Sequence, residues 1–401
     1  MRSGQLAEVL AERGHDVLWW AATFDHLRKR HRSDVDRSVR LSERLHIEML
    51  HSRGYRSNIS MRRVLDHREL GRRFRRNARL HHAPDVILAS LPPLEICAEA
   101  VSYAKERGIP LVVDVRDLWP DIFLFPMPTA LRPLGRIALF GEFRRLSSIT
   151  RDATALTAVS DDYLSWALRK AGREPSPWDR VFHLGYEVRR PATRSDDFDW
   201  QKIGVDRLHL VLAFVGTFGR TYDLATVIRA ARELWNAGVH DVRFVLGGDG
   251  EQGDAWRRLA AGLPNVVFPG WLSASQIWAL LERADVGLAA YAVGAPQSLP
   301  NKPFEYMSGG LVLMSSLGGE LQTLIRRYGI GYSYPPGDVS ALVARVQGLR
   351  DDRELTRQMG LRSKALFLER FDSGKLHVQM AEYLIELARS VEARQKTGVM
   401  V

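Results

Sequence analysis

The sequence predicts an α/β protein built from two doubly wound halves. Short apolar segments of strand length alternate with helical segments, which is typical of parallel sheets covered by helices on both faces. This alternation is interrupted once, between Gly185 and Val205, and then begins again. A length of 401 residues also exceeds what one small core needs, so two domains are expected.

The first half begins in a helix. Residues 4–14, GQLAEVLAERG, have helical spacing and end at Gly14. Apolar strands are expected at 15–22, 84–90, 109–115 and 153–159. A doubly wound half normally opens with a strand before its first helix. We therefore expect this half to lack its first strand, either because the chain continues upstream or because that strand and its glycine loop are lost.

The second half repeats the pattern after a polar hinge. The stretch from Gly185 to Val205 is weakly periodic, as linkers are. A helix is then expected at 223–238, with strands at 208–216, 241–248, 265–270, 286–291 and 311–316. In two such halves we expect a ligand in the cleft between them, at the carboxyl ends of the strands.

Composition excludes several classes of protein. The single cysteine, Cys97, allows no internal disulfide and suits a reducing cytosol. No apolar run approaches the ~20 residues that a membrane span needs. The first residues carry acids and arginines where a signal peptide would be apolar. A cytoplasmic location is therefore expected.

A basic patch stands out within the net charge of +10. Ten arginines lie between Arg53 and Arg79, against two acids, Asp66 and Glu69. The patch suits an anionic partner such as a phospholipid surface, a lipid-linked phosphate or a nucleic acid. A solvated helix face is the alternative. Few aromatic residues interleave the arginines, so we do not expect nucleic acid.

Two glycine-containing turns follow strands of the second half. In FVGTFGRTYD (214–223), glycines would let the backbone approach a phosphate, and Arg220 could contact it. Any strand-to-helix turn favours glycine, so this signal alone is weak. In LGGDGEQG (246–253) the glycines spell G-x-G-x-x-G, but the next strand ends at Pro269 and Gly270 instead of an acid. NAD is therefore disfavoured, and a glycine loop facing the cleft remains plausible.

The segment SLPNKPFEYMSGG (298–310) carries the sharpest signal. Pro303 suits a first helical turn, with Asn301 or Lys302 near the cap, and Glu305 is expected in that turn too. A glutamate there is ordinary, but a lysine opposes the helix dipole unless an anion lies over the helix end. Glu305 could accept two neighbouring hydroxyls, as on a ribose. Together they suit a nucleoside diphosphate.

The succession VGTFG, GGDG, NVVFPGWLS, ADVGLAAY, PNKPFEYMSGG and GGE resembles the donor-binding half of glycosyltransferase family 4, of the two-domain GT-B fold. DVRDLWPD (114–121) further resembles the branch that adds amino sugars, such as N-acetylfucosamine, to bacterial surface polysaccharides. The resemblance implies a UDP-sugar donor, retention of configuration, and no required metal or cofactor. It also implies an acceptor-side domain at 1–186, a donor domain at 187–375 and a terminal helix at 376–401 that packs back toward the first domain.

The resemblance also implies site residues. Glu305 matches the glutamate that holds the ribose hydroxyls, and Gln297 stands where a second glutamate often contacts the sugar. Thr217 and Asp223 replace the usual arginine and lysine, so Arg220 and Lys302 are the candidates for that positive charge. The implied catalytic residues are Arg116, Asp117, Gln297 and Glu305. The implied donor-binding residues are Gly216, Thr217, Phe218, Gly219, Arg220, Gly248, Asp249, Gly250, Trp271, Leu272, Ser298, Asn301, Lys302, Glu305, Gly318, Gly319 and Glu320.

The expected reaction moves a sugar, in particular an N-acetylated amino sugar, from a UDP-sugar to a lipid-linked or saccharide acceptor. The expected acceptor is a polyprenyl-diphosphate-linked saccharide of O-antigen, capsule or exopolysaccharide synthesis. The basic patch would then hold the protein at the cytoplasmic face of the inner membrane. A nucleotide-sugar epimerase of the same fold is the alternative, and a basic nucleic-acid-binding protein is a weaker one. Asp34–Asp36 and Asp197–Asp199 form D-x-D strings, but both lie in loop-like stretches, so no metal site is expected.

Overall fold

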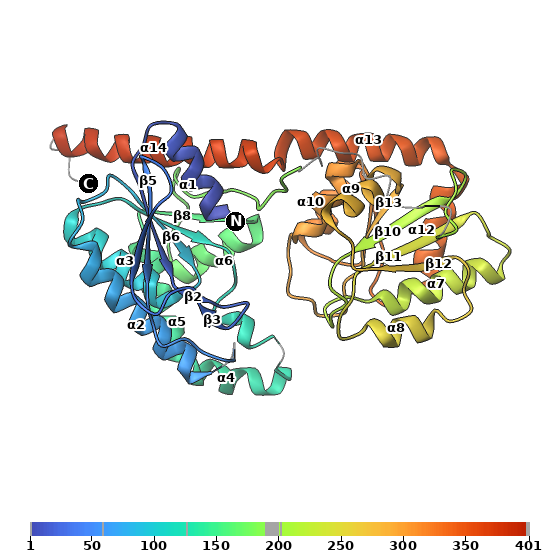
Figure 1. Cartoon of the computed structure of the whole chain (residues 1–401), viewed down its shortest axis with the longest axis horizontal. Coiled ribbons are helices and arrows are strands. Elements are labelled where there is room, and N and C mark those ends of the chain that lie inside the picture. The colour runs from blue at the N-terminus through green and yellow to red at the C-terminus, as the bar shows by residue number, and fades with distance from the viewer. Residues whose placement is uncertain (1, 58–59, 126, 189–199, 201–202, 398–401) are drawn as a thin grey trace. The chain divides into compact units, whose positions relative to one another are not determined.

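The computed structural model describes residues 2–57, 60–125, 127–188, 200 and 203–397, which form two compact units (Figure 1). Unit 1 runs to His183 and resumes at Gly374, and unit 2 runs from Leu184 to Ser373. The expected hinge at 185–205 falls largely on 189–199 and 201–202, outside the described residues. Asp197–Asp199 also lie outside them.

Unit 1 contains two sheets and a short hairpin. In the first sheet, ordered β1-β5-β4, β1 is parallel and β4 antiparallel to β5. The second, ordered β6-β7-β8-β9, is parallel throughout, and β2 pairs with β3 in the hairpin. The bounds are β1 Val17–Ala22, β2 Phe24–Asp25, β3 Arg30–His31, β4 Arg37–Arg40, β5 Leu45–Leu50, β6 Ile87–Leu91, β7 Leu111–Val115, β8 Ala155–Ala158 and β9 Arg180–Val181.

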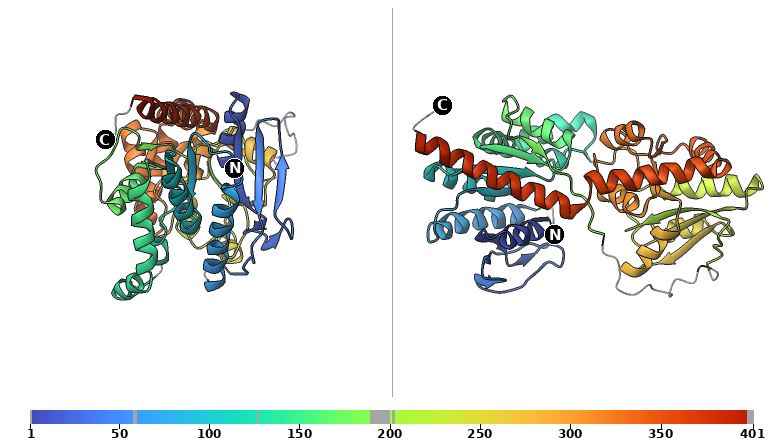
Figure 2. Two further views of the ribbon diagram at one scale, coloured as in Figure 1. Left: turned by 90° about the vertical axis from the view of Figure 1, so that its left-hand side faces the viewer. Right: turned by 90° about the horizontal axis from the view of Figure 1, so that it is seen from above.

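Helices cover both faces of the second sheet, because successive side chains of a strand point to opposite sides. Val113 of β7 packs in a core with α2, α3, α5 and α6, whereas Val112 packs with α1 and α14. Figure 2 shows α14 lying along this unit. The bounds are α1 Arg2–Glu12, α2 Met61–Ala78, α3 Leu94–Arg107, η1 Asp121–Phe123, η2 Thr129–Leu131, α4 Arg132–Ala138, α5 Phe140–Asp152, α6 Asp161–Ala171 and α14 Ser373–Thr397.

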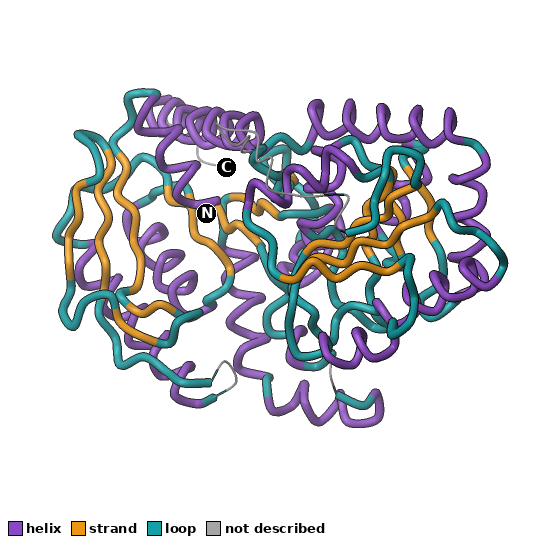
Figure 3. The backbone as a smooth tube through the Cα atoms, turned by 45° about the vertical axis from the view of Figure 1, so that its right-hand side comes forward, coloured by secondary structure: helices purple, strands orange, loops and turns teal. Residues whose placement is uncertain are grey.

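Unit 2 is one six-stranded parallel sheet with the order β12-β11-β10-β13-β14-β15. The strands lie side by side between helices in Figure 3. The chain order reverses between β10 and β13, and ligands of such sheets bind at this switch point, beyond the carboxyl ends of the strands. The bounds are β10 Leu210–Val215, β11 Val242–Gly247, β12 Val266–Gly270, β13 Val286–Ala289, β14 Val312–Ser315 and β15 Gly331–Ser333.

The core of unit 2 also lies on both faces of its sheet. Leu212 and Phe214 of β10 pack with α7, α8 and α12, and Val211 and Ala213 pack toward α9. The α/β prediction of doubly wound halves is confirmed. None of the described helices is both long and apolar enough to cross a membrane. The bounds are α7 Leu224–Asn236, α8 Gly253–Leu259, α9 Ala274–Arg283, α10 Asn301–Gly309, α11 Glu320–Tyr328, α12 Val339–Asp351 and α13 Arg353–Arg370.

Candidate functional site

At the switch point of unit 2, the turn after β10 is hydrogen-bonded to the loop after β11. The backbone N–H of Phe218 donates to the carbonyl of Asp249 at 2.8 Å, and that of Gln252 donates to the carbonyl of Phe218 at 2.9 Å. These bonds hold the two loops backbone to backbone. The turn beginning at Gly216 therefore has a fixed shape without help from a ligand.

The glycines of the second loop have a packing role. A Cβ atom at Gly248 would collide with the carbonyl oxygen of Gly216, and one at Gly250 would lie 2.9 Å from the carbonyl oxygen of Phe218. Both glycines also have positive φ, 138° and 152°. Only glycine allows this approach. The contact explains these glycines of the G-x-G-x-x-G pattern without a dinucleotide.

Helix α10 reaches the end of β10 through Lys302. Its Nζ donates to the carbonyl of Val215 and lies 4.6 Å from the centre of the Phe214 ring. A Cβ atom at Gly216 would collide with this Nζ. Burial lowers the pKa of Lys302 to about 8. The lysine thus places a partly buried cation directly behind the turn that was expected to hold phosphate.

Glu305 lies on the same helix and is partly buried. Burial raises the pKa of its carboxyl, although the neighbouring Lys302 and the hydroxyl of Tyr186 favour the ionised form. Tyr186 donates to Glu305 Oε1 at 3.2 Å. The expectation that Glu305 lies in the first turn is wrong. The helix starts at Asn301, immediately after the extended Pro300, so the first turn ends before Glu305 and contains no acid.

Three helices begin at this edge of the sheet with no side-chain cap. They are α8, α10 and α11, the last of which follows Gly319. By contrast, Asp223 caps α7 by accepting from the backbone N–H of Thr226. Uncapped N–H groups and the positive end of the helix dipole favour an anion.

The loop before α10 adds polar side chains. Ser298 Oγ donates to Glu320 Oε2 at 3.1 Å, which ties this loop to the first residue of α11. Oε1 of Gln297 is buried and accepts no hydrogen bond from any residue that the structure describes. A buried acceptor without a donor is costly, so this amide suits a ligand hydroxyl.

Other predicted residues have different surroundings. Arg220 is exposed and forms an ion pair with Glu251, and Trp271 is also exposed. The side chains of Phe218 and Leu272 are buried in the core, so only their backbones are left for a ligand.

Arg116 and Asp117 belong to unit 1 and are not part of the unit 2 site. Both follow β7, at its carboxyl end. Arg116 Nε donates to the buried carboxylate of Asp114 at 2.7 Å, and its Nη1 donates to Ser3 Oγ at 3.0 Å. Burial raises the pKa of Asp117. Their predicted catalytic roles stay predictions.

The contacts of unit 2 that could not be predicted from the sequence include those of Tyr186 and Arg257. Tyr186 lies 119 positions from its partner Glu305, and nothing in its own neighbourhood marks it. Arg257 donates to Asp249 Oδ1 at 2.9 Å, one turn into α8, where a basic residue looks like any solvated side chain. The carboxylate of Asp249 therefore already has a cationic partner.

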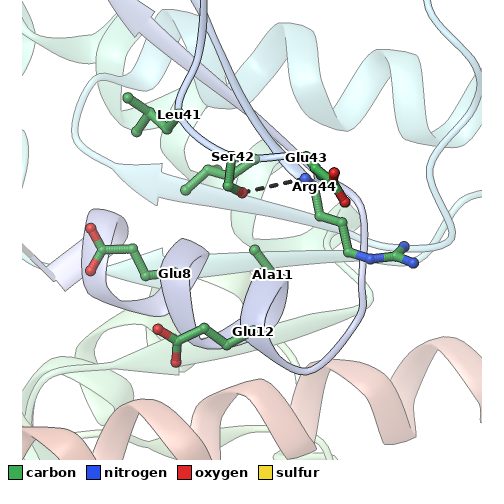
Figure 4. Close-up of a pocket in the computed structure, with 8 residues that line it drawn as sticks. Glu8, Ala11, Glu12, Leu41, Ser42, Glu43 and Arg44 are labelled. Atoms are coloured by element: carbon green, nitrogen blue, oxygen red, sulfur yellow. Dashed lines mark hydrogen bonds between the residues drawn. The ribbon is translucent and has the colours of Figure 1, made fainter.

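A separate pocket lies in unit 1, between α1 and the turn from β4 to β5 (Figure 4). Its lining includes Glu8, Glu12 and Glu43 beside the one cation, Arg44. Three carboxylates would repel a diphosphate, so this pocket does not suit a nucleotide. Among the described residues, no three histidine, cysteine or acidic side chains are grouped as a metal ion requires.

Residues 209–352 match the family model described as Glycosyl transferases group 1. This stretch is therefore similar to group 1 glycosyltransferase domains. It contains every unit 2 residue predicted for the site, from Gly216 to Glu320. The prediction of a glycosyltransferase is confirmed at the level of this domain. No match was found among curated proteins.

Solved structures extend the fold assignment beyond the group 1 domain. Sucrose-phosphate synthase from Thermosynechococcus elongatus is similar over 96% of this chain and 92% of its own, with a TM-score of 0.67 and 17% identity. HepE of Anabaena in complex with UDP is similar over 85% and 86%, with a TM-score of 0.62 and 15% identity. WaaG, a glycosyltransferase involved in lipopolysaccharide biosynthesis, is similar over 96% and 95%, with a TM-score of 0.57 and 14% identity. The GT-B prediction is confirmed.

Proposed function

We propose that this protein is a retaining glycosyltransferase of family 4 that uses a UDP-sugar donor. The observation that carries the proposal is the pair Lys302 and Glu305, which helix α10 holds at the switch point of the group 1 domain. One is a partly buried cation behind a glycine turn, and the other is a partly buried carboxylate. The similarity to HepE, solved with UDP and with UDP-glucose, supports UDP as the nucleotide.

Each part of the donor has a candidate partner. The carboxylate of Glu305 accepts hydrogen bonds from both ribose hydroxyls. The diphosphate lies over the glycine turn and the uncapped start of α11, near Lys302. The unsatisfied Oε1 of Gln297 accepts from a sugar hydroxyl. Charge that develops on the leaving UDP is stabilised by Lys302, with Arg220 as a second source.

The proposal also names the transferred sugar and its acceptor. We assign transfer of an N-acetylated amino sugar to a polyprenyl-diphosphate-linked saccharide in surface polysaccharide synthesis. Its support is the resemblance of DVRDLWPD and the similarity to WaaG. In this proposal Arg116 and Asp117 contact the transferred sugar.

The proposal places the enzyme at the cytoplasmic face of the inner membrane. Nine of the ten arginines between Arg53 and Arg79 fall into two groups on α2 and its flanks. Arg53, Arg73, Arg75 and Arg79 form ion pairs with acidic side chains. Arg56, Arg62, Arg68, Arg72 and Arg76 are exposed and have no ion pair with any described residue. Three of them, Arg68, Arg72 and Arg76, follow one another at intervals of four residues along α2, so these three are the candidates for lipid contact.

A transfer assay tests the proposed function. Purified protein is incubated with UDP-sugars, with and without a polyprenyl-diphosphate-linked sugar, and products are separated by mass. Release of UDP that requires the acceptor supports the proposal. Interconversion of the donor without acceptor would identify an epimerase instead. The anomeric configuration of the product, measured by NMR, tests retention.

A further inference from the structure

The segment around α4 exposes apolar side chains in unusual density. Leu134, Ile137 and Phe140 are 62%, 72% and 61% exposed, and Phe125 and Leu131 are exposed as well. Isolated exposed leucines are ordinary, but contiguous exposed apolar residues mark a surface for a partner. We call these five residues the α4 surface.

The charged side chains within this segment are all positive. Between Asp121 and Glu142 the only charged side chains are Arg132 and Arg136. Arg136 is exposed and pairs with no acid among the described residues, and Arg144 lies over the ring of Phe140. Apolar residues with interspersed cations are typical of segments that lie in the headgroup region of an anionic bilayer.

The side of α4 opposite the α4 surface packs against neighbouring residues of unit 1. Gly135 is buried, and a Cβ atom there would lie 2.7 Å from a methyl carbon of Leu124 and 2.8 Å from the sulfur of Met127. Arg132 Nε donates to the carbonyl of Met127 at 3.3 Å. The exposed residues therefore project from an anchored element.

The same end of unit 1 carries the beginning of α2. Arg63 lies 4.4 Å from the centre of the Trp119 ring, and that ring packs on Phe123 at 4.9 Å, two residues before Phe125. In the first two turns of α2, Met61 and Leu65 are exposed, ahead of the exposed arginines. Figure 1 shows α4 and this end of α2 in the same region of unit 1.

We propose that the α4 surface inserts into the headgroup region of an anionic bilayer. The arginines of α4 and α2 attract the membrane, and the apolar side chains make the contact that high salt does not abolish. The inference rests on the proposed function in that a lipid-linked acceptor lies at a membrane. Vesicle binding itself requires neither donor nor catalysis.

A labelled cysteine tests the insertion. Cys97 is fully buried, and burial raises the pKa of its thiol to about 12, so an introduced exposed cysteine reacts selectively. We attach an environment-sensitive fluorophore to Ile137→Cys and, as the control, to Leu208→Cys in unit 2, where the leucine is 82% exposed. With phosphatidylglycerol-containing vesicles the label at 137 should shift to the blue, and the label at 208 should not.

A triple variant supplies the second measurement. Leu134→Gln, Ile137→Gln and Phe140→Gln together should weaken vesicle affinity at least tenfold while the affinity for UDP stays unchanged. Vesicle binding without a shift at position 137 would overturn the proposal, since contact would then be electrostatic alone. A shift that grows with protein concentration and needs no vesicles would also overturn it, in favour of a second copy. Loss of UDP binding with intact insertion would refute only the proposed function.

Discussion

At the residue scale, the central feature is a pair of opposite charges on α10. Lys302 and Glu305 are both partly buried, and burial disfavours the charged form of each. Each stabilises the ionised state of the other. A donor would complete the arrangement, because its phosphates supply anions for Lys302 and its hydroxyls supply donors for Glu305.

The lowered pKa of Lys302 predicts a pH dependence of UDP binding. Its pKa of about 8 means that the charged fraction falls between pH 7 and pH 9. Bound phosphate favours the charged form, so affinity should fall on the order of tenfold over this range. Calorimetric titration at both pH values measures the loss.

Two variants control this titration. Lys302→Met should bind UDP more weakly at pH 7. Between pH 7 and pH 9 its affinity should fall only by the small amount that ionisation of UDP itself causes. Lys302→Arg keeps its charge at pH 9 and should show the same small loss. A wild-type affinity that changes no more than that of Lys302→Met would contradict the role of Lys302.

The sequence alone was enough to select Lys302 and Glu305 as candidates for this site. The proline-flanked Asn301-Lys302 and the following Glu305 could be recognised because their spacing is local, and so is the conflict of Lys302 with the helix dipole. Tyr186 could not be found, since its contact with Glu305 joins segments 119 positions apart. The ion pair of Arg220 with Glu251 was also invisible, because two adjacent loops create it.

At the scale of elements, the site depends on two loops that touch through glycine. The turn after β10 and the loop after β11 approach so closely that a methyl group at Gly248 would collide with the backbone. The alternation of strands and helices was predictable from hydrophobic periodicity. The contact between the loops was not predictable, because a glycine required for packing and a glycine that binds phosphate give the same sequence pattern.

The glycine contact predicts a difference between two alanine variants. Gly248→Ala meets a backbone oxygen at a positive φ of 138°, so it should destabilise unit 2 by more than about 2 kcal/mol. Gly219→Ala has no atom within 4 Å of the added Cβ, so its stability should stay within about 0.5 kcal/mol of wild type. Urea denaturation of both proteins measures this. Equal stability of the two variants would contradict the packing role.

At the scale of the whole molecule, two groups of charged side chains matter: the arginines of α2 and the charged residues of the donor site. The sequence identified the patch from Arg53 to Arg79 by counting arginines. It could not separate the arginines that form ion pairs from those that do not, because the acidic partners lie on other segments, as Glu106 does for Arg75 and Arg79.

The exposed arginines predict salt-sensitive vesicle binding. Replacing Arg68, Arg72 and Arg76 with glutamine should weaken co-sedimentation with anionic vesicles at 0.1 M salt, because each basic residue near such a surface contributes about 1 kcal/mol. A control replaces Arg229, Arg258 and Arg326, three exposed arginines of unit 2, and so removes equal charge. Equal losses in the two triple variants would contradict a specific role for α2.

The most direct test of a UDP site in unit 2 is calorimetric titration of UDP into Glu305→Ala. Removing the carboxylate should cost about 1.5–3 kcal/mol of binding free energy, the range for hydrogen bonds to a charged group. Glu354→Ala, which removes an exposed carboxylate on α13, should bind like wild type. A folded Glu305→Ala protein with unchanged UDP affinity would contradict the account.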